Sequence, residues 1–471
     1  MKDIDIIKKM TCKEDNSLIE TMRIIDDAGY TIAIATDKNE KFLGLIADSD
    51  IRRAILRGTD VNDSISKVIN RNPVVMRSEQ LNKKGGIQQK IEESFRRQAD
   101  PPIIPIIDKN KKVSNLLFIF SDKKYKLLNE GVRQDDVVKR VLIIGGAGYL
   151  GSVLCRKLLN KGYKVRVMDI CLFGEESLED LKKNKNFELI KEDMRNITAI
   201  TKALIDVDAV ILLAAIVGDP ASIAQPVEAI ETNYLATKMI AEACKYHQIN
   251  RFIFASTCSV YGKCDGLADE TTPLNPQSLY ARSKIQSEEA ILEMTDENFS
   301  PVSMRMGTLY GMSYRMRFDL VVNTFALKAV TEGKISIFGG SQWRPLLNVE
   351  DAADAYVACL SAPINSIRGE IFNVGDESQN YQIKNLGELV RKVFPDIEVK
   401  NVDKETVEGK LDLRNYKVSF EKIKDNLNFN PKKTVTQSLE EIAKAITLGK
   451  IKNPKDPKYY NLNQHTNKIG Y

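Results

Sequence analysis

The sequence predicts an α/β protein in which a doubly wound parallel sheet, with a small C-terminal lobe, follows a smaller α+β unit. From residue 141 onward, apolar strand-like runs alternate with longer helical patterns, which is typical of parallel βαβ units with a sheet buried on both faces. A glycine-rich segment joins the first of these strands to the first helix, and an internal repeat occupies the front of the chain. We therefore divide the chain into a front unit at 1–126, a linker at 127–139, the sheet and lobe at 140–450, and a polar tail at 451–471.

Composition limits the classes of protein that this chain can belong to. With 471 residues, 43% hydrophobic and 28% charged, it is an ordinary globular protein, and a net charge of +5 gives no reason to expect a nucleic-acid partner. No apolar run reaches the ~18 residues that a membrane span needs, so we expect a cytoplasmic protein without a membrane partner. Seven cysteines without a C-x-x-C and only two histidines argue against a disulfide framework, a metal site and a Ser-His-Asp triad.

The front unit contains two similar segments, IAIATDKNEKFLGLI at 32–46 and IIPIIDKNKKVSNLL at 103–117. Each has an apolar strand, a D-K-N turn and a second strand, which predicts a β-hairpin. The period is too long for a solenoid, so we expect a pseudo-symmetric pair that shares one core.

The segments FLGLIADSDIRRAILRG and KVINRNPVVMRSEQ resemble the tandem CBS-type regulatory domain, and the similarity covers roughly residues 7–125. The resemblance implies an adenine nucleotide whose ribose is held by a small hydroxyl residue and an Asp. Asp50 matches that Asp, but Ala47 replaces the hydroxyl residue, and Ser121 stands where the second copy would have its Asp. We expect at most one adenine-nucleotide site, at Asp50; the alternative is a ligand-free pair used for dimerisation.

Two polar segments separate or follow the folded parts. Residues 126–139, KLLNEGVRQDDVVK, lack a clear period and predict the linker. The final stretch, NPKDPKYYNLNQHTNKIGY, is polar and contains proline, so we expect an extended or disordered tail.

The glycine-rich segment follows the strand Val141–Ile144 directly and places glycines at Gly145, Gly148 and Gly151. Glycines allow a tight turn, close approach of a pyrophosphate and close packing of helix on strand, while the helix N-terminus supplies amide donors. Asp169 ends the next strand, where its carboxylate can accept hydrogen bonds from both ribose hydroxyls and repel an additional phosphate. The pattern predicts that NAD binds in preference to NADP.

A Tyr and a Lys four residues apart, Tyr280 and Lys284, lie in a helical stretch and therefore share one face. A free Tyr with a pKa near ~10 is a poor base at neutral pH, but a neighbouring Lys and the positive nicotinamide ring both favour the phenolate. We expect Tyr280 to be the acid–base group of a chain that has almost no histidine.

The strand before this helix ends in Ser256-Thr257-Cys258-Ser259-Val260-Tyr261-Gly262. Together, G-x-x-G-x-x-G, S-T-x-x-V-Y-G and Y-x-x-x-K resemble the extended short-chain dehydrogenase/reductase family with its Rossmann fold, in the nucleotide-sugar epimerase/dehydratase branch, over roughly residues 139–450. RMGTLYG, RPLLNVEDA and FNVG continue the similarity.

The resemblance implies a set of site residues. Thr257 would hydrogen-bond the reacting sugar hydroxyl and Arg344 would grip the substrate diphosphate. Arg317 and Asn323 are further candidates for the substrate pocket, with a structural cap or salt bridge as the alternative. The residues expected to contact NAD are Gly145, Gly148, Tyr149, Leu150, Gly151, Asp169, Asp193, Met194, Ala214, Ala215, Asn233, Tyr280 and Lys284.

One departure from the family pattern bears on the reaction. Dehydratases of this branch carry an acidic residue just after the catalytic Thr, whereas this chain has Cys258 and Ser259, so elimination of water is disfavoured. We expect a homo-oligomeric, NAD-dependent nucleotide-sugar epimerase, acting at C4, in which Tyr280, Lys284 and Thr257 are catalytic. The alternatives are a nucleotide-sugar 4-dehydrogenase or ketoreductase, and a non-catalytic protein that senses NAD.

Overall fold

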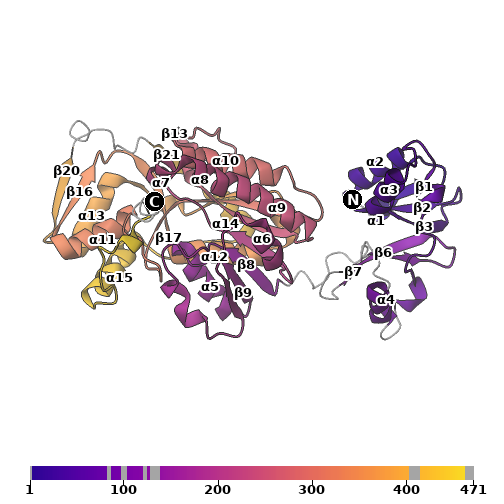
Figure 1. The fold of residues 1–471 in the computed structure, drawn as a ribbon. Coiled ribbons are helices and arrows are strands. Elements are labelled where there is room, and N and C mark those ends of the chain that lie inside the picture. Colours follow the sequence, from indigo (N-terminus) through magenta and orange to yellow (C-terminus); the bar gives the residue numbers. More distant parts are fainter. Residues whose placement is uncertain are drawn as a thin grey trace. The chain divides into compact units, whose positions relative to one another are not determined.

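The computed structural model describes residues 3–81, 86–96, 103–119, 125–127, 138–402 and 414–461. The chain forms two compact units, Met1–Asp136 and Val137–Tyr471 (Figure 1). The predicted linker at 127–139 includes the boundary between them, and its residues 128–137 lie outside the described residues.

The front unit repeats one arrangement of helix and sheet. In each half a short strand runs parallel to the first strand of an antiparallel hairpin. The first sheet has the order β1 (Thr11–Lys13), β2 (Ile32–Thr36), β3 (Phe42–Ala47), and the second has β4 (Met76–Arg77), β5 (Ile103–Ile107), β6 (Val113–Ile119), β7 (Tyr125–Leu127). The helices are α1 (Asp3–Lys9), α2 (Leu18–Ala28), α3 (Asp48–Leu56) and α4 (Gly86–Arg96).

The two hairpins close with the same turn, as the repeat predicts. The carboxylate of the first turn residue, Asp37 or Asp108, accepts hydrogen bonds at 2.8 Å from the amides two and four positions later. Ile32 of the first copy lies in one buried cluster with Ile103 and Leu116 of the second. The expected shared core is therefore confirmed.

The second unit is built on a sheet of seven strands in the order β10-β9-β8-β11-β12-β14-β18. All neighbouring pairs are parallel. The order reverses between β8 and β11, which opens a crevice at the carboxyl ends of these strands and confirms the doubly wound prediction. The strands are β8 (Arg140–Ile144), β9 (Lys164–Met168), β10 (Phe187–Ile190), β11 (Ala209–Leu212), β12 (Arg251–Thr257), β14 (Ser300–Met306) and β18 (Ile371–Val374).

Helices cover both faces of this sheet. Val141 and Ile143 of β8 pack in the core formed with α5 (Tyr149–Asn160) and α12 (Val349–Ser361). Leu142 and Ile144 face the opposite way, into the core formed with α6 (Ile197–Ala203), α9 (Ala236–Tyr246) and Ile291 of α10 (Leu279–Leu292). Both faces of a parallel strand are thus apolar, which explains why these segments are continuous hydrophobic runs.

A third core lies in the C-terminal lobe (Figure 1). Its main elements are α11 (Val321–Glu332), α13 (Ile383–Val393), α15 (Val435–Thr447), β16 (Lys334–Phe338) and β20 (Glu398–Val402). Short sheets continue the lobe, with β15 (Thr308–Tyr310), β17 (Trp343–Asn348) and β19 (Asn380–Gln382) in one and β13 (Lys263–Ala268) and β21 (Asn415–Val418) in another. Three further helices are α7 (Asp219–Ala224), α8 (Pro226–Ile230) and α14 (Glu421–Leu427).

The expectation of an extended or disordered tail is wrong for residues 451–461, which pack on the lobe. Ile451 is buried, and the amide of Phe318 donates to the carbonyl of Tyr459 at 3.0 Å, with the two rings 5.7 Å apart. A few apolar and aromatic side chains anchor this segment although its average composition is polar. Residues 462–471 lie outside the described residues.

Within the described parts of the chain, no helix is both long and apolar enough to cross a membrane.

A buried ion pair fastens α10 to the sheet beneath it. Arg305 on β14 and Glu288 on α10 each have only 3% of the side chain exposed, and Arg305 Nη2 lies 2.7 Å from Glu288 Oε2. The same guanidinium donates to the Tyr261 hydroxyl at 3.0 Å, and that hydroxyl donates to Asn373 Oδ1 at 2.7 Å. Because α10 carries Tyr280 and Lys284, this network helps to set their position.

We expect Glu288→Gln to lower the free energy of unfolding of the second unit by about 3–5 kcal/mol, because it leaves a buried guanidinium without a counter-charge. The single tryptophan, Trp343, lies in this unit, so its fluorescence during urea denaturation measures the loss. Glu188→Gln is the matched control, since it removes a carboxylate that is 52% exposed and paired with Arg166. Equal effects of the two substitutions would contradict this role of the buried pair.

Candidate functional site

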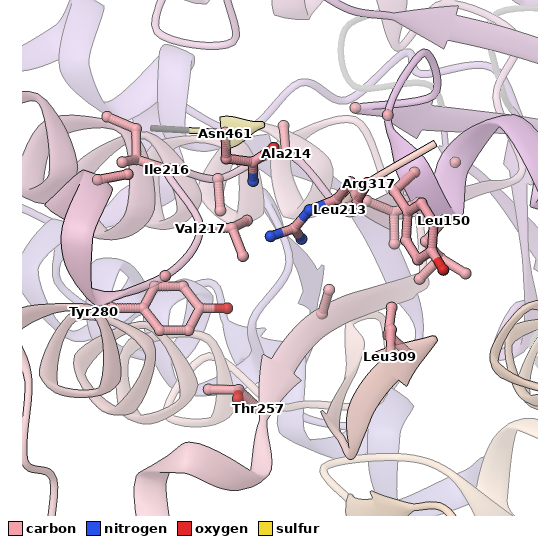
Figure 2. Close-up of a pocket in the computed structure, with 18 of the residues that line it drawn as sticks. Leu150, Leu213, Ala214, Ile216, Val217, Thr257, Tyr280, Leu309, Arg317 and Asn461 are labelled. Carbon is pink, nitrogen blue, oxygen red and sulfur yellow. The ribbon is translucent and has the colours of Figure 1, made fainter. Parts of the chain in front are cut away.

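A pocket of about 1010 Å³ lies at the carboxyl ends of the central strands of the second unit. The residues that follow β8, β9 and β11 line it, together with the end of β12. This is the crevice where the strand order reverses, the usual ligand site of an open parallel sheet. Figure 2 shows the side chains of Tyr280, Thr257 and Arg317 reaching into this space.

The glycine-rich loop after β8 has the close contacts that its sequence predicts. Gly145 has a φ of 93°, and a Cβ there would lie 2.5 Å from the amide nitrogen of Ala214. A Cβ on Gly151 would lie 2.3 Å from the carbonyl oxygen of Gly145. The loop leads into α5, with Gly148 at the N-cap. The amides of the first helical turn have no acceptor within the helix, which suits them to an anionic ligand.

Asp169 lies directly after β9 and lines the same pocket. Its Oδ2 accepts a hydrogen bond from the amide of Ala147 at 2.9 Å, and its Oδ1 accepts from the amide of Cys171 at 2.7 Å. Burial raises the pKa of this carboxyl, while the two amides act in the opposite direction. The remaining lone pairs can still accept from ribose hydroxyls. Asp169 therefore supports the glycine-rich loop and also offers the predicted acceptor.

Most of the other residues predicted to contact the cofactor line the pocket. Leu150, Met194, Ala214 and Ala215 line the pocket. Tyr149 also lines it, but its hydroxyl donates to the carbonyl of Gly311 at 2.7 Å and so connects α5 to the lobe.

Asp193 lines the pocket after β10, and its carboxylate is paired with Arg195 at 2.7 Å. Its contact with NAD remains a prediction.

Asn233 is not among the residues that line the pocket, which differs from the prediction. It is fully buried in the π-helical turn Glu231–Leu235, where its Oδ1 accepts from the amide of Ile216 at 2.8 Å and its Nδ2 donates to the carbonyl of Ile216 at 3.1 Å. The amide is thus used to fix the loop after β11. The loop itself lines the pocket, so Asn233 supports the site from behind.

The three predicted catalytic residues line one pocket. Ser278 caps α10, which carries Tyr280 and Lys284, and Thr257 is the last residue of β12. Lys284 Nζ donates to the carbonyl of Ala255 at 2.8 Å and lies 5.9 Å from the centre of the Tyr280 ring. The structure therefore brings together the groups that the sequence motifs contain.

Burial has the largest effect on the pKa values of Tyr280 and Lys284. It raises the pKa of Tyr280 well above its usual value and lowers the pKa of Lys284 to about 7. Among the charges near Tyr280, Arg317 and Arg414 lower its pKa and Asp219 raises it. Lys284 is not one of the charges that dominate the pKa of Tyr280, where loss of solvation outweighs the cations Arg317 and Arg414.

The segment after Thr257 supplies no acid to the pocket. Thr257 Oγ1 donates to Ser259 Oγ at 3.0 Å and accepts from the amide of Ser259 at 3.1 Å. Cys258 faces the core, where its Sγ donates to the carbonyl of Arg305 at 3.1 Å and burial raises the pKa of the thiol.

The predicted substrate residues have different surroundings. Arg344 is buried at the edge of the pocket, and its Nη1 donates to the carbonyls of Trp343 and Arg414. Arg317 reaches into the pocket and forms two hydrogen bonds with Asp319, at 2.9 and 2.8 Å (Figure 2).

Asn323 does not line the pocket, so the alternative of a structural role describes it better. Its Oδ1 accepts from the amide of Gly311 at 2.9 Å, and its Nδ2 donates to the Tyr149 hydroxyl and to the carbonyl of Arg317 at 3.1 and 2.9 Å. These bonds use both Nδ2 hydrogens and one lone pair of Oδ1, and they hold the loop that carries Arg317.

Several pocket residues lie outside every motif. Arg315 Nη2 donates to Asn461 Oδ1 at 2.8 Å, and the guanidinium stacks 3.7 Å over the ring of Phe173. The lining residues missed by the motifs include Asp219, Arg315, Arg414, Tyr416, Tyr460 and Asn461.

In the front unit, Asp50 has partners within the protein. Its Oδ2 accepts from the amide of Ala47 at 3.1 Å and its Oδ1 pairs with Arg53 at 2.8 Å, at the start of α3. Ser121 lies outside the described residues. Adenine-nucleotide binding at Asp50 remains a prediction, as does the homo-oligomer.

We expect Asp169→Asn to weaken NAD binding by about tenfold or more, because it removes the charged acceptor from the ribose hydroxyls, a hydrogen bond of about 1.5–3 kcal/mol. Titration calorimetry with NAD and NADP measures the change, and NADP should lose no affinity. Asp206→Asn is the control, since Asp206 is exposed and outside the pocket. Unchanged NAD affinity in Asp169→Asn would contradict the assignment.

Comparison with known proteins agrees with this geometry. The family model described as the NAD dependent epimerase/dehydratase family matches residues 141–375. The chain is 32% identical over 249 residues to the uncharacterized UDP-glucose epimerase YtcB of Bacillus subtilis (strain 168), covering 50% of this chain and 76% of that protein. It is 28% identical over 319 residues to a UDP-N-acetyl-alpha-D-glucosaminuronate decarboxylase of Bacillus cytotoxicus, covering 64% of this chain and 96% of that protein.

Among solved structures, the chain is similar to UDP-glucuronic acid 4-epimerase from Bacillus cereus in complex with UDP-glucuronic acid and NAD. The TM-score is 0.59 at 28% identity, and the match covers 66% of this chain and 99% of that one. The chain therefore belongs to the NAD-dependent epimerase/dehydratase family, as an enzyme that uses NAD.

Proposed function

We propose that this chain is a nucleotide-sugar 4-epimerase that oxidises and re-reduces its substrate at C4. The observation that carries the proposal is the convergence of Tyr280, Lys284 and Thr257 in one pocket at the carboxyl edge of the sheet. The turn after Thr257 adds no carboxylic acid, which supports an alcohol–ketone interconversion over elimination of water.

The residues of the glycine-rich loop suit NAD. The first-turn amides of α5 would hold its pyrophosphate and Asp169 its ribose, and a side chain at Gly145 or Gly151 would collide with the backbone. NAD, when bound, supplies the hydride acceptor and a positive ring.

Tyr280 then acts as the base. Its phenolate removes the proton of the C4 hydroxyl while that carbon gives up its hydride, and Thr257 orients the hydroxyl through a hydrogen bond. The keto sugar turns over in the pocket, the hydride returns to the other face of C4, and Tyr280 gives its proton back to the oxygen. Lys284 lies on the same helix face, 5.9 Å from the ring centre, and as an ammonium it would favour the phenolate.

The pocket also has a place for the nucleotide. Arg344 is buried at its edge, and a planar guanidinium suits a diphosphate. The similarity to proteins named as a UDP-glucose epimerase and a UDP-glucuronic acid 4-epimerase supports a UDP-sugar. A volume of about 1010 Å³ is at the upper end of ligand pockets, as two large ligands require.

The direct test is to incubate the NAD-loaded protein with UDP-glucose and with UDP-glucuronic acid, and to follow NADH absorbance and the sugar products. A C4 epimer without net NADH supports the proposal. Accumulating NADH would identify a net dehydrogenase, release of CO₂ a decarboxylase, and a 4-keto-6-deoxy sugar a dehydratase; each would overturn the epimerase assignment. No turnover of any nucleotide sugar would favour the NAD-sensing alternative.

In the same assay we expect Tyr280→Phe to lower kcat by about 10²–10⁴-fold, because the ring keeps its shape and loses the proton-transferring oxygen. NAD content, measured by native mass spectrometry, should stay unchanged. Tyr246→Phe is the matched control, since Tyr246 is 83% exposed. Near-wild-type turnover in Tyr280→Phe would rule out this base.

A further inference from the structure

Asp219 carries a carboxylate oxygen that the protein leaves unsatisfied at the pocket. Its Oδ1 is buried and has no hydrogen-bond partner, whereas its Oδ2 lies 3.4 Å from Arg414 Nη1. The side chain as a whole is 25% exposed and lines the pocket. A buried acceptor without a donor is costly in a folded protein, so such an atom calls for a donor from outside the protein, either a water or a ligand.

The backbone holds Asp219 firmly in this place. It follows the loop that Asn233 fixes through both backbone groups of Ile216, and it is the first residue of α7. Ile216 and Ala221 pack with Leu279 of α10, the residue before Tyr280. The unsatisfied oxygen is therefore on a rigid part of the site and close to the acid–base group.

The contacts of Asp219 also connect it to the proposed diphosphate site. Arg414 pairs with Asp219 through its side chain and accepts a hydrogen bond from Arg344 through its carbonyl. Contacts thus connect Asp219 to Arg344, the proposed diphosphate residue, through Arg414. They also connect its loop to Leu279, the residue before Tyr280. In a nucleotide sugar, the group between the diphosphate and the reacting carbon is the sugar ring.

The charge and hydrogen-bonding capacity of the Asp219 carboxylate determine which group of a ligand it can bind. An ionised Asp accepts hydrogen bonds and repels anions, so it suits a sugar hydroxyl and not a phosphate oxygen. Its negative charge raises the pKa of Tyr280, which is the wrong direction for a group that assists removal of the proton. The role that fits is positioning of the sugar.

We propose that Asp219 is a sugar-positioning residue whose Oδ1 accepts a hydrogen bond from a ring hydroxyl other than the one that Tyr280 deprotonates, while Arg414 holds Oδ2. This inference rests on the proposed function, because it needs a nucleotide sugar in the pocket. It assigns a specificity role to a residue outside every sequence motif.

The test is calorimetric titration of the NAD-loaded protein with UDP-glucose and, separately, with UDP. Asp219→Ala should weaken UDP-glucose binding by about tenfold or more, as for loss of a hydrogen bond to a charged group. UDP binding should stay the same or tighten, because UDP lacks the sugar and Arg414 is released. Asp219→Asn should restore part of the UDP-glucose affinity, since its amide oxygen can still accept.

Asp180→Asn is the matched control, because it removes another Asp–Arg pair, with Arg156, outside the pocket. It should leave both affinities unchanged. A second readout is the pH dependence of kcat/KM: Asp219→Asn should move the acid limb to lower pH, with Arg317, Arg414, Tyr416 and Lys284 still beside Tyr280.

Two results in the variants would overturn the inference: unchanged UDP-glucose affinity in Asp219→Ala, or equal weakening for UDP and UDP-glucose, which would mean that Asp219 only holds Arg414. If the wild type bound neither ligand, the proposed function itself would fail.

Discussion

Loss of solvation at Tyr280 and Lys284 is the constraint on which the site depends. Both side chains are buried, and burial favours the neutral phenol and the neutral amine, the opposite of the charged forms that hydride chemistry needs. The protein's own cations do not overcome this effect. A positive nicotinamide ring would act in the same direction as these cations, so we expect the ionisation of Tyr280 to depend on the presence of oxidised NAD.

Such dependence has a functional advantage. In the proposed mechanism, a phenol that is neutral without the positive ring would act as a base only once the hydride acceptor is in place, which would couple proton removal to hydride transfer. Asp219 increases this dependence, because its charge also opposes the phenolate. The network of Arg305, Glu288 and Tyr261 fastens α10 to the sheet, so packing helps to set the position of Tyr280 relative to the glycine-rich loop.

The sequence predicted the sheet, the glycine-rich loop and the catalytic motifs because each of these is local. A strand, a tight turn and a helix start, as at Val141–Gly151, are encoded by neighbouring residues, and so is the four-residue spacing of Tyr280 and Lys284. The hairpin repeat of the front unit could be predicted for the same reason, from Asp37 and Asp108.

The features of the site that the sequence did not predict depend on contacts between segments that are distant in the chain. Nothing near Asn233 or Asn323 in sequence shows that the amide is used by Ile216 or Gly311. Asn233 was predicted to contact NAD, and Asn323 was a candidate for the substrate pocket with a structural role as the alternative; neither lines the pocket. Asp219 and Asn461 belong to no motif, and they reach the pocket only because α7 packs on α10 and the tail packs on the lobe. The ionisation of Tyr280 likewise depends on burial, which spacing alone does not give.

The most direct test is to measure the ionisation of the Tyr280 hydroxyl as a function of pH. NMR of the protein with ¹³Cζ-labelled tyrosine monitors this ionisation, and the Tyr280→Phe variant assigns the signal. We expect the Tyr280 signal to titrate at a distinctly lower pH in the protein loaded with NAD⁺ than in the protein loaded with NADH, whose nicotinamide ring is uncharged. The same titration midpoint in both forms would contradict this expectation.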